Sequence, residues 1–150
     1  FLPARLESFA KFRARAPMGD VLVPSDPNMR RYGMNPYGGY DSSHTPFLYR
    51  GELPGVVAPL ARVVAVGKRA WSVDYLQIKQ RIETKAGLIL TWEKGQNSAL
   101  DSGVIAEGRD VGNVLVQRRN DEGKLVEAQY RVDFAFAFYA FHPDVKITVE

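Results

Sequence analysis

The stretch ESFAKFRARAPMGDVLVP, residues 7–24, decides how the chain is organised, because its pattern returns at the other end. Ser8 is a suitable N-cap, and Phe9 and Phe12 are three residues apart, so they share one face of a helix. Pro17 ends that helix, since proline cannot continue the hydrogen-bonded turn, and the apolar VLV that follows predicts a short strand.

The last stretch, VDFAFAFYAFHPDVKITVE, residues 132–150, repeats this order of helix, proline and strand. Asp133 is the expected cap, Pro143 is the expected stop, and the aromatic residues spaced for one helical face are Phe134, Phe138 and Phe141. The alternation of Phe and Ala at the start of this stretch also fits a strand, and only Phe141 and the proline favour a helix. Aligning the two prolines places Phe12 on Phe138, which indicates two copies of one module ending.

The residues between the two copies predict a connector and then a β-rich module. Residues 24–46 hold four of the nine prolines and three of the tyrosines, which is typical of a long ordered connector. We expect a hairpin over 63–73, a short helix over 74–79, a buried strand over 87–92 and a second hairpin over 111–132 with NDEG as its turn. Five to seven clustered strands with two or three short helices predict an α+β fold with a mainly antiparallel sheet.

The composition is that of a globular protein, and it narrows the function classes. Hydrophobic residues make up 45% and charged residues 25%, with apolar runs of only a few residues, so neither disorder nor a membrane span is expected. The net charge is +3, but the basic residues occur as separated pairs with acidic residues among them, which is typical of a solvated surface and not of a nucleic-acid binder. The absence of cysteine excludes disulfides, thiolate nucleophiles and zinc–thiolate sites from this chain.

Two groups of residues are candidates for a ligand site. One is a glycine-rich loop whose flat, amphipathic rings either bind a ligand such as a sugar or pack back onto the domain: Tyr32, Tyr37, Tyr40 and the neighbouring Asp41. The other is AEGRDVGNV, where Arg109 and Asp110 make either a structural ion pair or a polar site for an anionic ligand. We expect no catalytic residue, no metal site and no cofactor, since the sequence has neither an EF-hand loop nor a nucleophile elbow.

Several stretches together resemble one known family. They are LPARLESFAKFRAR, YGMNPYGGYD, PFLYRGELP, ARVVAVGKRAWSVDYL, ALDSGVIAEGRDVGNVLVQ and FAFAFYAFHPD. Through nearly its whole length the chain is similar to the domain of unknown function 3179 family of bacterial exported proteins. The resemblance implies two tandem modules behind a signal peptide, and therefore a periplasmic or secreted location. It also implies that residues 1–23 are the closing helix and strand of an upstream module, residues 24–46 a connector, and residues 47–150 the second β-rich module.

The same resemblance bears on chemistry and partners. The family's Cys-Pro-Leu-Cys motif falls here on residues 93–96, with Glu93 and Gln96 at the cysteine positions, so thiol redox chemistry and soft-metal binding are excluded there. We expect a non-catalytic scaffold or ligand-binding module whose partner is the upstream module of the same protein, with other protein subunits left open. The alternative is half of a hydrolase-like enzyme acting on a carbohydrate or phosphate-bearing substrate, with four residues converging: Asp41, His44, Arg109 and Asp110.

Overall fold

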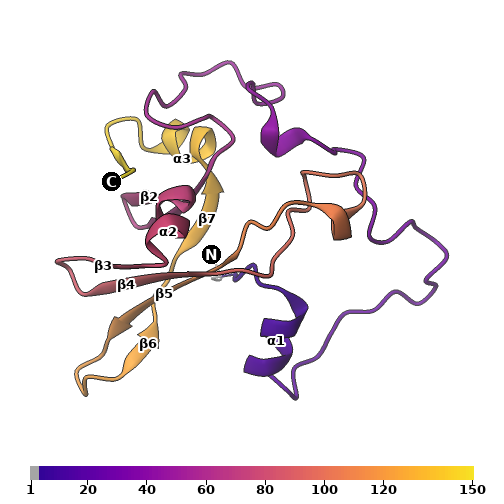
Figure 1. The fold of residues 1–150 in the computed structure, drawn as a ribbon, viewed down its shortest axis with the longest axis horizontal. Coiled ribbons are helices and arrows are strands. Elements are labelled where there is room, and N and C mark those ends of the chain that lie inside the picture. The colour runs from indigo at the N-terminus through magenta and orange to yellow at the C-terminus, as the bar shows by residue number, and fades with distance from the viewer. Residues whose placement is uncertain (1–3) are drawn as a thin grey trace.

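Two four-stranded sheets form the body of the molecule in this computed structural model, which describes residues 4–150 (Figure 1). The first sheet has the order β7-β1-β2-β8 and contains β1 (Arg62–Val66), β2 (Arg69–Ser72), β7 (Arg131–Phe134) and β8 (Ile147–Thr148). The second has the order β3-β4-β5-β6 and contains β3 (Arg81–Glu83), β4 (Leu88–Glu93), β5 (Asn113–Arg119) and β6 (Leu125–Glu127). The α-helices are α1 (Phe9–Arg15), α2 (Val73–Lys79) and α3 (Ala135–Phe141). The fold is α+β and β-rich, with every strand pair antiparallel except β2 with β8, as the sequence predicts.

The local hairpins form where the sequence predicts them. β1 and β2 pair antiparallel around a two-residue turn, at which Gly67 has a positive φ of 58° that suits glycine. β4 is the predicted buried strand, and β5 pairs with β6 across the predicted NDEG turn. α2 begins after Ser72, whose side chain accepts a hydrogen bond from the Tyr75 N–H and so caps the helix.

The second strand predicted for the second hairpin is wrong, because it is shorter than predicted and its last residues belong to a different sheet. The sequence predicts one strand through residue 132, but β6 ends at Glu127 and β7 begins at Arg131 in the other sheet. The residues between them cross the core, where Tyr130 is buried and its hydroxyl donates to the Val114 carbonyl at 2.7 Å. The single stretch therefore contributes a strand to each sheet. With β3, which the sequence does not predict, residues 4–150 contain eight strands.

The two helices that the sequence treats as copies are confirmed as helices, with one error in capping. Ser8 caps α1, since its side chain accepts from the Lys11 N–H. The predicted cap Asp133 is wrong: the N-cap of α3 is Phe134, which has no side-chain cap, and Asp133 lies in β7 beside Arg131 at 3.2 Å. The predicted aromatic face is also only partly buried, because Phe141 at its end is exposed.

The core has two parts, one on each face of the first sheet. Between the two sheets, α2 and both tryptophans complete a cluster of buried residues: Val64, Trp71, Val73, Leu76, Leu88, Leu90, Trp92, Val114, Val116, Ala128 and Tyr130. On the other face, α3 packs on β1 through a smaller cluster: Val63, Ala65, Ala70, Ala135, Phe138 and Ile147. The first sheet is therefore covered on both sides, and α3 is the layer that closes its outer face (Figure 1).

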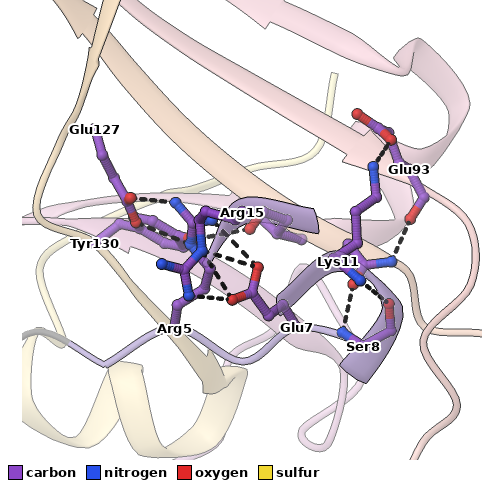
Figure 2. Close-up of polar contacts among 10 residues, drawn as sticks. Arg5, Glu7, Ser8, Lys11, Arg15, Glu93, Glu127 and Tyr130 are labelled. Atoms are coloured by element: carbon purple, nitrogen blue, oxygen red, sulfur yellow. Dashed lines mark hydrogen bonds and ion pairs between the residues drawn. The ribbon is translucent and has the colours of Figure 1, made fainter. Parts of the chain in front are cut away.

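The N-terminal segment is held against the second sheet by polar contacts (Figure 2). The Arg5 guanidinium lies between two carboxylates and donates to Glu127 and Glu7. The Ser8 N–H donates to the Asn113 side chain at 2.7 Å, and Lys11 forms an ion pair with Glu93. Arg5 thus contacts β6, and α1 is held where β4 ends and β5 begins. Residues 1–3 of the predicted upstream segment lie outside the described residues.

The predicted strand over VLV is not formed. Residues 21–23 are exposed and pair with no strand among residues 4–150. The equivalent segment of the second copy is β8, which pairs with the outer edge of β2 and so leaves no place there for residues 21–23.

Candidate functional site

The tyrosine loop, which we define as residues 33–44, is ordered by contacts with the long loop that precedes β5. The Asn35 N–H donates to the Gly103 carbonyl at 2.9 Å, and the Gly39 N–H donates to the Asp101 carbonyl at 2.7 Å. Gly39 has a φ of 79°, a backbone conformation that glycine adopts without steric cost, and a short 3-10 helix (Tyr40–Ser42) follows it. The loop is therefore docked on its own module, and its side chains are presented from a fixed backbone.

One side of the tyrosine loop lines an apolar hollow, which we call the tyrosine pocket. It has a volume of about 550 Å³ and is lined by Tyr37, Gly38, Gly39, Tyr40, Phe47 and Leu100. Tyr40 is fixed from two sides, because its ring packs edge-on against Phe134 at 6.0 Å and its hydroxyl accepts from the Phe47 N–H at 3.3 Å. Tyr37 is mostly exposed, so its ring is available to a ligand.

The other side of the loop holds a buried ionic group, the Asp41 cluster, made of Asp41, Arg62, Ser98 and Arg109. One carboxylate oxygen of Asp41, Oδ2, accepts from Arg62 at 2.8 Å and from the Ser98 hydroxyl at 2.5 Å. Arg62 also donates to the Ser98 hydroxyl at 2.9 Å, which closes a triangle of hydrogen bonds. The half-exposed Arg109 lies 3.4 Å from the same oxygen.

This arrangement keeps Asp41 ionised. Burial alone would favour the neutral acid, but hydrogen bonds from Ser98 and Arg62 and the positive charges of Arg62 and Arg109 outweigh burial. The pKa of Asp41 is therefore below the ordinary value of an aspartate. The second carboxylate oxygen, Oδ1, is buried and has no hydrogen-bond partner in the described part of the chain.

The Asp41 cluster lies on the wall of a second hollow, the polar cleft, also of about 550 Å³. Its walls come from four separate parts of the sequence and carry donors and acceptors of both charges, among them Asp41, Ser42, His44, Arg62, Asp74, Gln77, Arg109 and Asp110. Tyr40 faces the tyrosine pocket and Asp41 the polar cleft, so two adjacent residues separate an apolar surface from a polar one.

Asp110 lines the polar cleft, but its carboxylate accepts hydrogen bonds from backbone N–H groups. It accepts from the N–H groups of Gly95 at 2.8 Å, Gln96 at 3.1 Å and Gly112 at 2.9 Å. Burial opposes its charge, and these three hydrogen bonds outweigh burial and lower the pKa of Asp110. Asp110 thus stabilises the turn after β4, the place where the family resemblance puts the cysteine motif.

The structure brings some of the predicted site residues together and leaves one apart. Tyr37 and Tyr40 share the tyrosine pocket, while Asp41, Arg109 and Asp110 share the polar cleft. Tyr32 is exposed and lines neither hollow.

Sequence reasoning missed Arg62 and Ser98 of the Asp41 cluster and Phe47 of the tyrosine pocket. Arg62 carried one usable signal, since a charge directly before the apolar run VVAV needs a partner when the strand is buried. Ser98 and Phe47 lie in loops without a pattern that points to the site.

The acid sensitivity of the protein is expected to depend on Asp41. The pKa of this carboxyl is near 3.8 in the unfolded state and is lowered by folding. At pH values above 3.8 the ionised group therefore stabilises the folded state, and this stabilisation is lost as the pH falls through the folded-state pKa. Asp41→Asn should therefore flatten the fall of unfolding free energy below about pH 4, measured by urea unfolding at several pH values. Asp110 and Glu7, whose pKa values are also lowered, keep part of the slope. Asp121→Asn, on the exposed NDEG turn, is the control and should leave the wild-type slope. Equal slopes in both variants would contradict this account.

The described residues contain neither a metal-binding cluster nor a helix that could span a membrane. Across 4–150, no group of three or more His, Cys, Asp or Glu side chains is placed to hold a metal ion. In the same residues, no helix has the length and apolar character needed to cross a membrane.

Comparison with known proteins identifies the family. The family described as protein of unknown function (DUF3179) matches residues 1–145, so the chain belongs to this family. No curated protein and no solved structure matches the chain.

Proposed function

We propose that this chain is a non-catalytic, ligand-binding module of an exported bacterial protein built from tandem modules, and that its ligand is a carbohydrate. The observation that carries the proposal is the tyrosine loop, which presents an aromatic pocket on one side and a polar cleft on the other. An oligosaccharide offers surfaces of both kinds, since its rings have apolar faces that stack on aromatic side chains and hydroxyl groups that need both donors and acceptors.

The charges around the polar cleft favour a neutral ligand over an anion. Arg62 and Arg109 are already balanced, because both lie within 4 Å of the buried Asp41 and Arg109 also lies 4.0 Å from Asp101. Asp74 adds a further acidic group to the wall. An anionic ligand would have to displace an existing ion pair, whereas hydroxyl groups can share the donors and acceptors that face the cleft.

The enzyme alternative is supported less well by the same residues. Asp41, His44, Arg109 and Asp110 do line one cleft. A glycosidase-type general acid needs a carboxyl with a raised pKa, but the pKa values of both aspartates are lowered. Within residues 4–150 no hydrogen bond joins His44 to a serine or an aspartate, which a nucleophile–base pair requires. Ligand binding needs neither a raised pKa nor a nucleophile–base pair, so it fits these residues better.

The test is isothermal titration with a panel of neutral oligosaccharides, namely cello-, chito-, malto- and xylo-oligosaccharides. At least one is expected to bind, and Tyr37→Ala should weaken that binding roughly tenfold by removing a stacking surface. Tyr32→Ala is the matched control, since Tyr32 is an exposed tyrosine of the same connector that lines neither hollow. Both variants should keep the wild-type unfolding temperature. Failure of every oligosaccharide to bind, or equal loss in the two variants, would overturn the proposal, and turnover of a bound oligosaccharide would favour the enzyme alternative.

A further inference from the structure

The ends of α1 and α3 have the same local structure as well as the same sequence pattern. Both helices have seven residues and stop at a C-cap with nearly equal backbone angles, φ −133° and ψ 70° at Ala16 and φ −141° and ψ 60° at His142. In each, the C-cap N–H donates back to a phenylalanine carbonyl, that of Phe12 at 2.8 Å and that of Phe138 at 3.1 Å. A proline follows directly in both.

The chain also leaves both helices in the same way. The Gly19 N–H donates to the Ala16 carbonyl at 2.9 Å, and the Val145 N–H donates to the His142 carbonyl at 3.1 Å. Position by position, Val21 and Leu22 then correspond to Ile147 and Thr148, which are the two residues of β8. Val21 and Leu22 of the first copy therefore stand at the same position after the helix as the two residues of β8 in the second copy.

The second copy shows what this helix and strand do when their partner is present. Phe138 is 1% exposed and packs with Ala135 on the outer face of the first sheet. β8 then pairs in parallel with β2, Ile147 opposite Ala70, and Ile147 is 5% exposed. The helix covers the face of the sheet, and the strand extends its edge.

The first copy has the same groups without that partner. Val21 is 51% exposed and Leu22 100%, although both are apolar. Phe12, which corresponds to Phe138, is half-buried and stacks on Phe9 of its own helix, which is 60% exposed. Within residues 4–150, the backbone of 20–23 makes no hydrogen bond to another strand. An exposed apolar segment whose backbone groups pair with no strand is a suitable donor for addition to a sheet edge.

This chain cannot supply the missing partner itself. The outer edge of β2 is occupied by β8, and the adjoining face is covered by α3. The same holds for a second copy of the chain. α1 is meanwhile held at the other end of the module, where Arg5, Ser8 and Lys11 contact the second sheet (Figure 2). The acceptor must therefore be another module, placed next to this one.

We propose that Phe9–Val23 closes the first sheet of a neighbouring module with this same fold. Val21 and Leu22 pair in parallel with the strand equivalent to β2, and Phe12 takes the position that Phe138 has in this module. The inference rests on the tandem part of the proposed function and not on its ligand. In this arrangement α1 contacts both modules, this one through Ser8 and Lys11 and the neighbouring one through Phe12.

The test compares the complete gene product with the present chain by hydrogen exchange. The N–H groups of Val21–Val23 should be protected in the complete product and exchange freely in the 150-residue chain. Free exchange in both, or a gene product without a preceding module, would overturn the inference. Protection that appears in the present chain together with dimerisation would also overturn it, because the partner would then be a second copy.

A pair of variants isolates the docked face. Val21→Asp places a charge where the equivalent Ile147 is buried, and should lower the unfolding temperature of the complete gene product by roughly 5 °C or more. Leu22→Asp is the matched control, because the equivalent Thr148 is only half-buried. Neither variant should alter the present chain, in which both positions are exposed. Equal effects of the two variants on the complete product would contradict the proposed register, and oligosaccharide binding measured on the same proteins tests the proposed function separately.

Discussion

Replacing Gly112 with alanine is expected to lower the free energy of unfolding by about 3 kcal/mol. Gly112 has a φ of 72°, which costs a residue with a Cβ about 1 kcal/mol. Its Cβ would also overlap the indole ring of Trp92. That ring cannot move away easily, because it is buried in the core between the sheets and its N–H donates to the Val111 carbonyl at 3.0 Å.

The control for this experiment is Gly123→Ala. Gly123 lies on the NDEG turn with a similar φ of 77°, but a Cβ there meets no atom within 4 Å. It should therefore cost only the backbone part, about 1 kcal/mol. Urea unfolding monitored by tryptophan fluorescence measures both values. Equal losses of unfolding free energy in the two variants would show that a Cβ at position 112 does not clash with Trp92.

The second large effect is expected from Arg62→Met, which should cost about 3 kcal/mol or more. The substitution keeps the length of the side chain but leaves the fully buried carboxylate of Asp41 without its closest cation, 2.8 Å away. Ser98 would also lose the hydrogen bond that it accepts from Arg62. A buried charge that loses its partner is much more costly than an exposed one.

Two further variants separate this pair from its surroundings. Arg109→Met removes the more distant, half-exposed cation, and should cost about 1 kcal/mol or less. The double variant Asp41→Asn with Arg62→Met should be more stable than Arg62→Met alone, because no buried charge is then left without its partner. Additive losses in the double variant would show that Asp41 and Arg62 are not coupled.

Much of the fold could be predicted from short-range pattern. The hairpin of β1 and β2 depends on an apolar run and a glycine turn, and α2 depends on the cap Ser72, all within a few residues of one another. The splitting of β6 from β7 could not be predicted in this way. Periodicity shows that a residue such as Tyr130 faces a core, but not that the chain at this point passes from one sheet to the other.

The candidate site shows the same division. Tyr37 and Tyr40 stand out because aromatic residues in a glycine-rich loop have a function or a packing role, and both line the tyrosine pocket. Arg62 and Ser98 do not stand out, because each is an ordinary residue whose importance comes from the buried carboxylate that it meets in three dimensions. The cap of α3 is a related case, since Asp133 has the right chemistry but lies one residue too early, inside β7.

The order of the strands determines the sequence in which the protein can assemble. The second sheet joins neighbours along the chain, with β3, β4, β5 and β6 side by side, so it can form from local contacts. The first sheet cannot form from local contacts, because β1 pairs with β7 and β2 pairs with β8, and both partners are made near the end of the chain. During synthesis the apolar β1–β2 hairpin is therefore made early and covered last. For that interval its open edges and its bare outer face need protection from other chains.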